Sequence, residues 1–481
     1  MRHATSKIVS FPNDSKNPGK ATMNNGVKTI GGDLVLPPLE DFTFDDVSNA
    51  RLFASRYRTM IRWQGDAGKW LVWEKTHWKA DSTGFVMLIA QAFAKSLYDL
   101  VPEIVRSKEE LQTGYRHAKR SNNVAGIRAF LELAKSEMTV NSSDLDRDHY
   151  LLNTLSGTID LKTGELKKHD PTDYLTKLCP FHYNVDADCS TWLEFLETIL
   201  PDESVRNYVQ KAIGYSLTGA VRERAFFICY GFGRNGKSVF IDTISKLLGD
   251  YARNTTADSL MRKQTGSIPN DVARLKGARF VTTAETDEGK QLHESLIKSL
   301  TGGDRITARY LFNEYFDFYF EGKLWLATNH KPVIKDQSNG MWDRIKLIPF
   351  STTIAPDQAI DKDELVELLL GEAAGILAWA VEGCLQWQRE KRLITPQAIE
   401  TEVARYKYEQ DSIAQFLEEK TETGEYFQTE NSELFNAYRE YCRENNEYEF
   451  SHRRFSQKLI ERGFTQTRQS KRYWNGIRLV Y

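Results

Sequence analysis

The residues most able to do chemistry lie between Gly231 and Val239, where the sequence GFGRNGKSV contains the pattern GxxxxGK[ST]. An apolar run of strand length, 225–230, precedes this segment. Residues 239–248 follow it with helical spacing and end at Gly249. In a strand–loop–helix of this kind, glycines let backbone N–H groups converge on phosphates, and the helix dipole adds positive charge. The pattern therefore favours a nucleotide site over the alternative, a glycine-rich turn without a ligand.

The predicted nucleotide site gives separate roles to two neighbouring side chains. We expect Lys237 to reach the β- and γ-phosphates and Ser238 to bind Mg²⁺. The expected cofactors are therefore ATP and Mg²⁺. The residues expected to hold the nucleotide are Gly231, Phe232, Gly233, Arg234, Asn235, Gly236, Lys237, Ser238 and Val239.

A P-loop enzyme also needs a carboxylate at the end of a neighbouring strand, where it holds Mg²⁺ or activates water. Residues 278–284 have the composition of a strand, and Glu285 follows them directly. Asp287 comes two residues later and would share the same face of an extended chain. Glu285 is our first candidate for the water-activating and Mg²⁺-binding role, and Asp287 is the second. Ordinary solvated acids after a strand are the alternative.

Two further polar residues stand beside later strands. Asn329 ends the run 323–328, and an amide at this place can orient the attacking water, although Asn is also a common turn former. Arg344 precedes the apolar run 345–350 and is a candidate arginine finger, which stabilises charge on the transferred phosphoryl group. A surface ion pair is the alternative for Arg344. If it acts on a neighbouring subunit, the active site exists only between subunits.

The whole chain is large enough to position these residues in several domains. It has 481 residues, of which 41% are hydrophobic, and 64 basic and 66 acidic residues give a net charge of −2. This balance excludes a wholly basic nucleic-acid coat, so any DNA contact must come from local patches. Five cysteines without a CxxC pair argue against a disulfide framework or a thiolate zinc site. The longest apolar stretch, 365–385, contains three glutamates and is expected to be a buried helix, and residues 1–20 lack a secretory signal.

Upstream of the nucleotide site the pattern predicts a compact α/β or α+β module. Two short aromatic strands, 61–63 and 70–73, flank a glycine turn, and residues 84–138 have the spacing of helices. Aromatic side chains of this region could stack nucleic-acid bases, but such a cluster is more often the core of a hairpin. The tryptophans concerned are Trp63, Trp70, Trp73 and Trp78.

The order of these motifs resembles that of superfamily 3 helicases, and most closely the helicase part of phage and plasmid primase–helicases related to poxvirus-type helicases. The motifs that carry the resemblance are the P-loop, Glu285-Thr286-Asp287, 296–304, Asn329-His330-Lys331-Pro332 and Arg344. The likeness extends over roughly residues 60–481. Segments 161–166 and 192–196 resemble the domain before the helicase, 375–380 and 411–417 its helical continuation, and 455–479 a winged helix.

The resemblance implies an α/β fold with an AAA+-like P-loop ATPase core and a parallel sheet. It also implies an N-terminal α+β helicase-associated domain, a C-terminal winged-helix domain, a hexameric ring and 3′→5′ translocation. The predicted ranges are 1–44 for a disordered tail or linker, 45–190 for the helicase-associated domain, 191–355 for the ATPase with its helical lead-in, 356–420 for a helical extension and 421–481 for the winged helix.

Two departures from the family pattern matter. Many relatives carry a primase domain upstream, and we expect none in this chain, so priming would need a separate primase. Relatives often have two adjacent arginines where this chain has Asp343 and Arg344. Arg344 is then the sole finger candidate, because Lys346 lacks the planar fork of a guanidinium.

Two regions are expected to contact DNA. The resemblance implies a hairpin that grips single-stranded DNA in the ring pore, and here 306–309 and 316–320 flank its tip; hairpin packing and salt bridges are the alternative. Residues 451–481 contain eight basic residues and one acidic residue, and 451–462 would be the recognition helix of a winged helix on duplex DNA; a solvated basic face is the alternative. The candidate contacts are Lys298, Arg309, Phe312, Asn313, Arg453, Arg454, Lys458, Lys471 and Arg472.

These features predict an ATP-dependent DNA helicase that replicates a phage, plasmid or genomic island in the cytoplasm of a bacterial host. Its expected partners are single-stranded and duplex DNA, further copies of the chain and a separate primase, but no membrane. The first alternative is an initiator that recognises an origin and melts it locally without processive unwinding. The second is a P-loop ATPase without a DNA role, such as a small-molecule kinase, against which the winged-helix-like tail argues.

Overall fold

The protein divides into two compact units in a computed structural model, which describes residues 42–262, 270–284, 288–309, 315–445, 447–468 and 470–480. The first unit contains the residues up to Gly65 together with Ser82–Thr139. The second contains Asp66–Asp81 and the chain from Val140 onward. The five domain ranges predicted from the sequence stay predictions.

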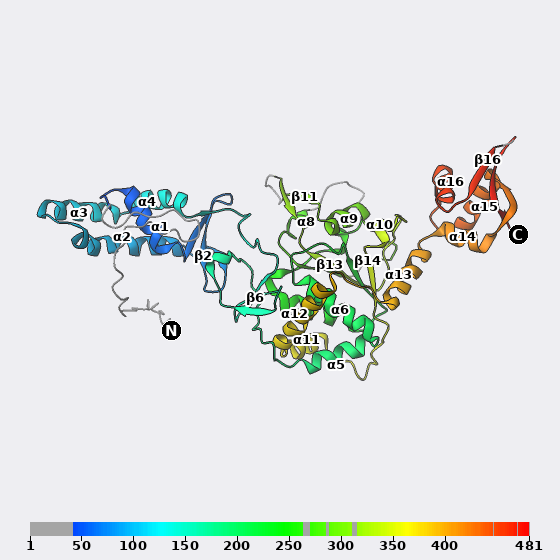
Figure 1. The fold of residues 1–481 in the computed structure, drawn as a ribbon, viewed down its shortest axis with the longest axis horizontal. Coiled ribbons are helices and arrows are strands. Elements are labelled where there is room, and N and C mark those ends of the chain that lie inside the picture. Colours follow the sequence, from blue (N-terminus) through cyan, green and yellow to red (C-terminus); the bar gives the residue numbers. More distant parts are fainter. Residues whose placement is uncertain are drawn as a thin grey trace, which may run out of the picture. The chain divides into compact units, whose positions relative to one another are not determined.

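The first unit is mainly helical (Figure 1). Its elements are α1 (Asp46–Tyr57), β1 (Ile61–Gln64), α2 (Phe85–Ile104), α3 (Lys108–Ser121) and α4 (Val124–Glu137). Ser107 and Asn123 begin α3 and α4 because their side chains accept hydrogen bonds from backbone N–H groups of the first turn. The rings of Phe53, Phe93 and Phe130 form its centre, with centroids 5.2–5.5 Å apart. The helices predicted at 84–138 are confirmed.

Among the described residues, one helix, α2, is long and apolar enough to cross a membrane by length and composition alone. The bent pair α11 (Lys362–Leu370) and α12 (Ala373–Glu390) would be a second such stretch only if the pair formed a single span. Eight residues of α2 are buried inside the first unit. The stretch 365–385, expected to be one buried helix, is instead two helices that meet at 76°. Nine residues of α12 are buried, so the prediction of burial is confirmed. The prediction of a single helix was wrong.

The second unit begins with small antiparallel sheets. β2 (Lys69–Trp73) pairs with β3 (Trp78–Ala80), and β5 (Leu151–Asn153), β6 (Thr158–Asp160) and β7 (Glu165–Lys167) form a meander. Trp78 is 2% exposed, and its indole N–H donates to the Pro171 carbonyl at 2.8 Å. Its ring lies 5.5 Å from that of Trp73. Trp78 is therefore a core residue, as the hairpin alternative predicted, and not a platform for bases.

A parallel five-stranded sheet forms the centre of the second unit, in the order β14-β8-β13-β10-β9. Its strands are β8 (Phe226–Tyr230), β9 (Ala252–Asn254), β10 (Phe280–Ala284), β13 (Lys323–Thr328) and β14 (Ile345–Pro349). Every residue of β13 is buried, as expected for a strand covered on both faces. The parallel sheet predicted for a P-loop core is confirmed.

Helices cover this sheet, and one of them follows the P-loop strand directly: α7 (Lys237–Leu248), which ends at Gly249 as predicted. Among the others, α5 (Ser190–Ile199) leads into α6 (Glu203–Ser216), which packs along α12. A Cβ on Gly214 would lie 2.0 Å from the backbone nitrogen of Cys384, so α6 and α12 cross in near backbone contact. The remaining helices here are α8 (Asn270–Ala273), α9 (Glu294–Gly302) and α10 (Asn339–Trp342), and β11 (Arg305–Ala308) and β12 (Phe316–Tyr319) form a hairpin. The two-residue strand β4 (Thr139–Val140) lies at the boundary between the units, and 3-10 turns lie at Pro171–Asp173, Gly249–Tyr251 and Ala257–Ser259.

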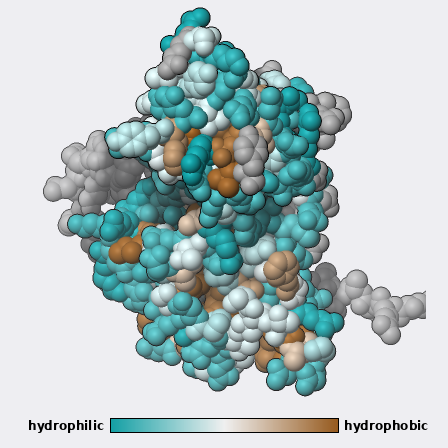
Figure 2. Space-filling view, turned by 90° about the vertical axis from the view of Figure 1, so that its right-hand side faces the viewer, coloured by the Kyte–Doolittle hydropathy of each residue, from teal (hydrophilic) through white to brown (hydrophobic). Residues whose placement is uncertain are grey.

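The C-terminal part of the second unit has its own small antiparallel sheet, in the order β15-β17-β16. Its aromatic core gathers Phe416, Tyr438, Phe455 and Trp474. The helix expected at 451–462 is confirmed as α16. The elements are α13 (Gln397–Glu409), α14 (Ser412–Lys420), β15 (Thr421–Glu430), α15 (Asn431–Glu444), α16 (His452–Glu461), β16 (Thr465–Arg468) and β17 (Arg472–Leu479). Figure 2 shows a mostly hydrophilic surface with a few separate hydrophobic groups.

Candidate functional site

The loop between β8 and α7 is held so closely that two of its positions require glycine. A Cβ on Gly236 would lie 2.4 Å from Ile199 of α5, and Gly236 has a φ of 77°. A Cβ on Gly231 would lie 2.2 Å from the carbonyl oxygen of Phe350, which follows β14. The loop therefore has a fixed path, and the first backbone N–H groups of α7 have no partners within the helix. This is the arrangement in which helix N-termini bind phosphate.

Lys237 lies buried inside this loop, 5% exposed. Its Nζ donates to the Gly231 carbonyl at 2.6 Å, to Asn235 Oδ1 at 3.0 Å and to Asn329 Oδ1 at 3.0 Å. Asn235 is fixed in turn, because its Nδ2 donates to the Phe350 carbonyl at 3.2 Å. The structure thus brings together two residues that lie 92 positions apart in the chain, Lys237 and Asn329.

The strand order explains this meeting. β13 lies between β8 and β10, and Thr328, its last residue, is level with Tyr230, the last residue of β8. Because the carboxyl ends of parallel strands share one edge, Asn329 must lie between the P-loop and the end of β10. β10 ends at that edge with Ala284, but the predicted Glu285 and Asp287 lie outside the described residues.

The residues at this edge fit a nucleotide with Mg²⁺. Lys237 offers a buried ammonium, the glycines keep side chains away from the loop, and Ser238 is exposed in the first turn of α7. Among the described residues, no group of three or more His, Cys, Asp and Glu side chains gathers as a metal site. Mg²⁺ that is held together with nucleotide phosphates needs only one or two protein ligands.

Arg344 lies at the other end of the sheet. Its carbonyl accepts a hydrogen bond from the backbone N–H of Phe226, the first residue of β8, whereas the P-loop follows the last residue, Tyr230. Four strand residues at 3.3 Å each separate the two ends by roughly 13 Å. The structure therefore does not bring Arg344 to the P-loop of its own chain.

The side chain of Arg344 is held in a defined place. Its Nε donates to Thr301 Oγ1 at 3.0 Å, and its Nη1 donates to the Gly340 carbonyl. Burial and the nearby Arg224 lower the pKa of Arg344, although arginine stays charged at neutral pH. Burial also lowers the pKa of Lys346, whose side chain is packed within β14. No sequence signal pointed to Thr301 as the partner that orients the guanidinium.

Two candidate DNA residues of the hairpin region already have partners within the chain. Lys298 Nζ forms an ion pair with Asp336 at 2.5 Å. Burial acts to raise the pKa of the Asp336 carboxyl, but the hydrogen bonds from Lys298 and Ser338 outweigh it and lower the pKa. Arg309 lies over the ring of Tyr315 at 5.0 Å. β11 and β12 form the expected antiparallel hairpin. The predicted contacts Phe312 and Asn313 lie outside the described residues.

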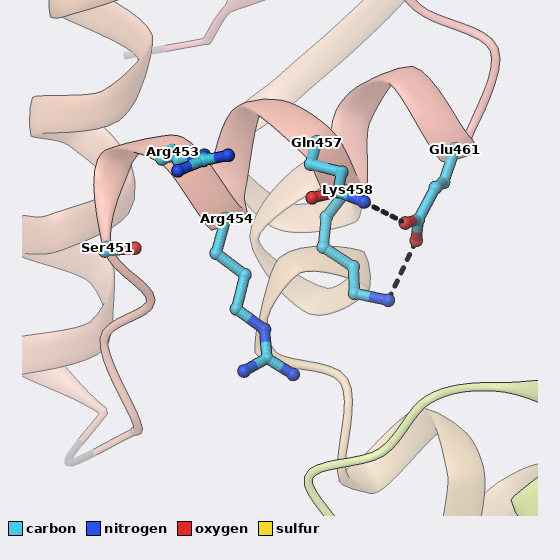
Figure 3. Close-up of a pocket in the computed structure, with 6 residues that line it drawn as sticks. All are labelled: Ser451, Arg453, Arg454, Gln457, Lys458 and Glu461. Carbon is cyan, nitrogen blue, oxygen red and sulfur yellow. Dashed lines mark hydrogen bonds and ion pairs between the residues drawn. The ribbon is translucent and has the colours of Figure 1, made fainter.

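The candidate DNA residues of α16 line one shallow surface (Figure 3). Arg453 is exposed, while the Arg454 guanidinium lies 5.3 Å from the ring of Phe450. Lys458 is tied to Glu461, with Nζ and Oε2 2.9 Å apart.

The turn after β16 adds two more cations. Lys471 forms an ion pair with Glu430 at 2.7 Å, whereas Arg472, the first residue of β17, is exposed. Within the described residues, Arg453 and Arg472 are the two predicted contacts without an ion pair or ring partner. The sequence alone did not separate them from the paired lysines.

The sequence reasoning gave no role to one residue that the structure places near Asn329. Lys331, two residues after Asn329, pairs with Glu409 of α13 at 2.7 Å. The partners lie 78 positions apart, so no local spacing could reveal the pair.

Three family descriptions match separate parts of the chain. Residues 50–201 match the description "D5 N terminal like", 229–344 match a family of unknown function named DUF5906, and 408–475 match "Poxvirus D5 protein-like".

Two of the similar proteins come from viruses. The chain is 32% identical to "Putative helicase L207/L206" of Acanthamoeba polyphaga mimivirus over 213 residues, which are 43% of this chain and 22% of that protein. It is 28% identical to "Putative helicase 022R" of Frog virus 3 over 245 residues, which are 47% of this chain and 25% of that protein. The chain thus spans about a quarter of the length of these relatives. The apo structure of the NrS-1 C-terminal region shares the fold, with a TM-score of 0.50, 9% identity, and coverage of 91% of this chain and 99% of that one.

Proposed function

We propose that this chain, which carries D5-type domains and is related to the superfamily 3 helicases, hydrolyses ATP to unwind DNA during replication. The observation that carries the proposal is the contact between Lys237 and Asn329 at the edge where β8 and β13 end. A buried lysine that contacts both the loop carbonyl and an amide from the neighbouring strand is poised to exchange these partners for phosphate oxygens. The names of the viral relatives support the helicase assignment.

Each residue at this edge has a distinct task in the proposed reaction. Lys237 binds the β- and γ-phosphates, and Ser238 contributes a hydroxyl ligand to Mg²⁺, which neutralises phosphate charge when bound. Asn329 Oδ1, 3.0 Å from Lys237 Nζ, is placed to orient the attacking water. Glu285 takes the proton of that water, with Asp287 as the second candidate.

A second subunit completes the proposed site. Because Arg344 lies at the opposite end of the sheet from its own P-loop, it serves the nucleotide of a neighbour. We infer a ring of several copies, hexameric by the family resemblance, with the β11–β12 hairpins on a single strand of DNA. The exposed Tyr315 and Tyr319 offer stacking surfaces there.

The C-terminal part is proposed to bind duplex DNA as a winged helix. The order α14-β15-α15-α16-β16-β17, with β17 between β15 and β16, supports this proposal. In that arrangement α16 is the recognition helix, and the turn between β16 and β17 is the wing. The biological setting proposed is a phage, plasmid or genomic island in the cytoplasm of a bacterial host, with a separate primase.

The test is ATP hydrolysis with and without single-stranded DNA, measured beside unwinding of a forked duplex. We expect DNA to stimulate hydrolysis and ATP to open the fork. Lys237→Ala should abolish both, while Lys211→Ala, which removes a distant lysine of α6, should change neither. Specific protection of one duplex sequence without fork opening would favour the initiator instead. Hydrolysis that ignores DNA, from a monomer, would reject a DNA motor.

A further inference from the structure

The segment that follows β13 packs against the end of α13. The Tyr406 hydroxyl donates to the Pro332 carbonyl. The backbone N–H of Ile334 donates to Gln410 Oε1 at 3.0 Å, and Gln337 Nε2 donates to the Gln410 carbonyl at 3.1 Å. The segment that carries Asn329 is thus fixed at several points to one helix from a distant part of the chain.

Lys331 is the fixed point nearest to Asn329. Its Nζ lies 2.7 Å from Glu409 Oε2, 5.0 Å from the centroid of the Tyr230 ring and 5.4 Å from that of Tyr406. The side chain of Lys331 is 12% exposed and that of Glu409 is 43% exposed. An ammonium between two aromatic faces and a carboxylate has a narrow choice of positions.

Tyr230 ties this cluster to the P-loop. It is the last residue of β8, and its ring lies 5.6 Å from that of Phe232 within the loop. Because Lys331 contacts both Tyr230 and Glu409, the end of α13 lies beside the end of β8. Burial and the Glu409 carboxylate raise the pKa of Tyr230. The Nε of Arg405 lies 3.8 Å from Glu409 Oε1, so Glu409 is held from its own helix as well.

We propose that Lys331 and Glu409 are a positioning pair that sets Asn329 against the terminal phosphate of ATP. The inference rests on the proposed function, since it assigns a new task within the same site. Lys331 acts through Asn329 in this proposal and not on the phosphate itself. It fixes the backbone two residues from Asn329, and a small displacement of such a group from its productive geometry can cost up to 100-fold in rate.

The matching variants separate charge from packing. Lys331→Met keeps the length and apolar stem but removes the ammonium, and Lys331→Arg keeps the charge and can pair with a carboxylate. Lys211→Met is the control, because Lys211 pairs with Glu390 at 2.8 Å and is 13% exposed, yet lies on α6. Lys331 and Lys211 are similarly buried, so the three variants differ only in the position of the substitution or in whether the positive charge is kept.

The measurements are kcat and KM for ATP hydrolysis, and the ratio of affinities for a non-hydrolysable ATP analogue and ADP. For Lys331→Met we expect kcat to fall about tenfold, KM to change far less, and the affinity ratio to move towards one. Lys331→Arg should recover most of kcat, and Lys211→Met should match the unaltered chain.

Two results would overturn the inference. One is a folded Lys331→Met protein with unaltered kcat and affinity ratio. The other is an equal loss in Lys331→Met and Lys211→Met, which would show a general stability effect. If the unaltered chain binds ATP but does not hydrolyse it, the proposed function itself fails, and the inference fails with it.

Discussion

Asp146 shows how a single carboxylate can stabilise the second unit without taking part in chemistry. Its oxygens accept hydrogen bonds from the Thr176 backbone at 2.8 Å, from the Thr176 hydroxyl, and from Lys177 Nζ at 2.9 Å. Burial acts to raise the pKa of Asp146, but the Lys177 charge and the Thr176 hydrogen bonds outweigh it and hold the pKa below its usual value. The folded state therefore favours the ionised carboxylate.

The lowered pKa of Asp146 sets the direction in which the stability of the folded state changes with pH. Because the folded pKa of Asp146 is lowered, its stabilisation is present above the ordinary aspartate pKa of about 4. It is lost as the pH falls through the folded pKa. Asp146→Asn should lower the melting temperature at pH 7 by about 4 °C, equivalent to about 2 kcal/mol. The difference from the unaltered chain should shrink in acid.

Melting curves of both proteins between pH 7 and pH 3 would check this. Glu422→Gln is the control, because Glu422 pairs with Arg478 where both side chains are half exposed, and such pairs stabilise little. Equal destabilisation by Asp146→Asn at both ends of the pH range would contradict the linkage.

At the residue scale, local spacing predicted some site residues and missed others for a clear reason. Lys237 belongs to a motif whose chemistry depends on neighbours in sequence, and the structure shows in addition that its side chain is buried. Asn329 was predicted from its place after a strand, and its Oδ1 lies 3.0 Å from Lys237 Nζ, while its role stays a prediction. Glu409 could not be predicted, because only the packing of α13 brings it to Lys331.

At the scale of elements, α16 and the turn after β16 carry cations of two kinds. Arg453 and Arg472 are exposed and have no ion-pair partner among the described residues, whereas Lys458 and Lys471 are already paired with glutamates. Binding of DNA by a paired lysine must first break its ion pair, which offsets part of the gain. The free arginines should therefore dominate binding.

The prediction concerns duplex affinity and its salt dependence. Arg453→Ala and Arg472→Ala should each weaken binding and reduce the slope of log affinity against log salt by about one. Lys458→Ala and Lys471→Ala should have smaller effects on both quantities. Titrations of a labelled duplex at several salt concentrations would measure them. Equal effects of all four variants would show that the ion pairs do not matter.

The helices and strands were predicted well where their pattern is local. They were predicted less well where a contact with a distant part of the chain decides where an element ends. The strands of the parallel sheet follow from apolar runs, and α7 follows from its spacing and Gly249. The break between α11 and α12 does not, because Glu372 is held by accepting hydrogen bonds from the backbone N–H groups of Thr191 and Trp192 at 3.1 and 3.0 Å. The sequence shows an apolar stretch with three glutamates there, and nothing in it marks Glu372 as the one that bonds a distant helix.

At the scale of the whole molecule, the positions of Lys237 and Arg344 predict a shared active site. Each of Lys237→Ala and Arg344→Ala should abolish hydrolysis alone. In an equal mixture, half of the P-loops and half of the arginines are intact, so about a quarter of the sites should recover if copies exchange freely.

The matched control mixes Lys237→Ala with Asn329→Ala. Both residues lie at the same edge of the sheet, so this mixture supplies no complete site at a mixed contact and should stay inactive. Recovery in the control, or none in the test mixture, would contradict a shared site. The measurement is ATP hydrolysis at constant total protein.

The opposite placement of Arg344 and the P-loop along one parallel sheet also constrains how copies can assemble. In the proposed ring, the face that gives Arg344 meets a different face that receives it, so the contact is heterologous. Each added copy presents a fresh receiving face, and addition stops only when the rotation between copies closes a circle. The same feature would let the chain build an open spiral whose end copies hold one idle P-loop and one idle arginine.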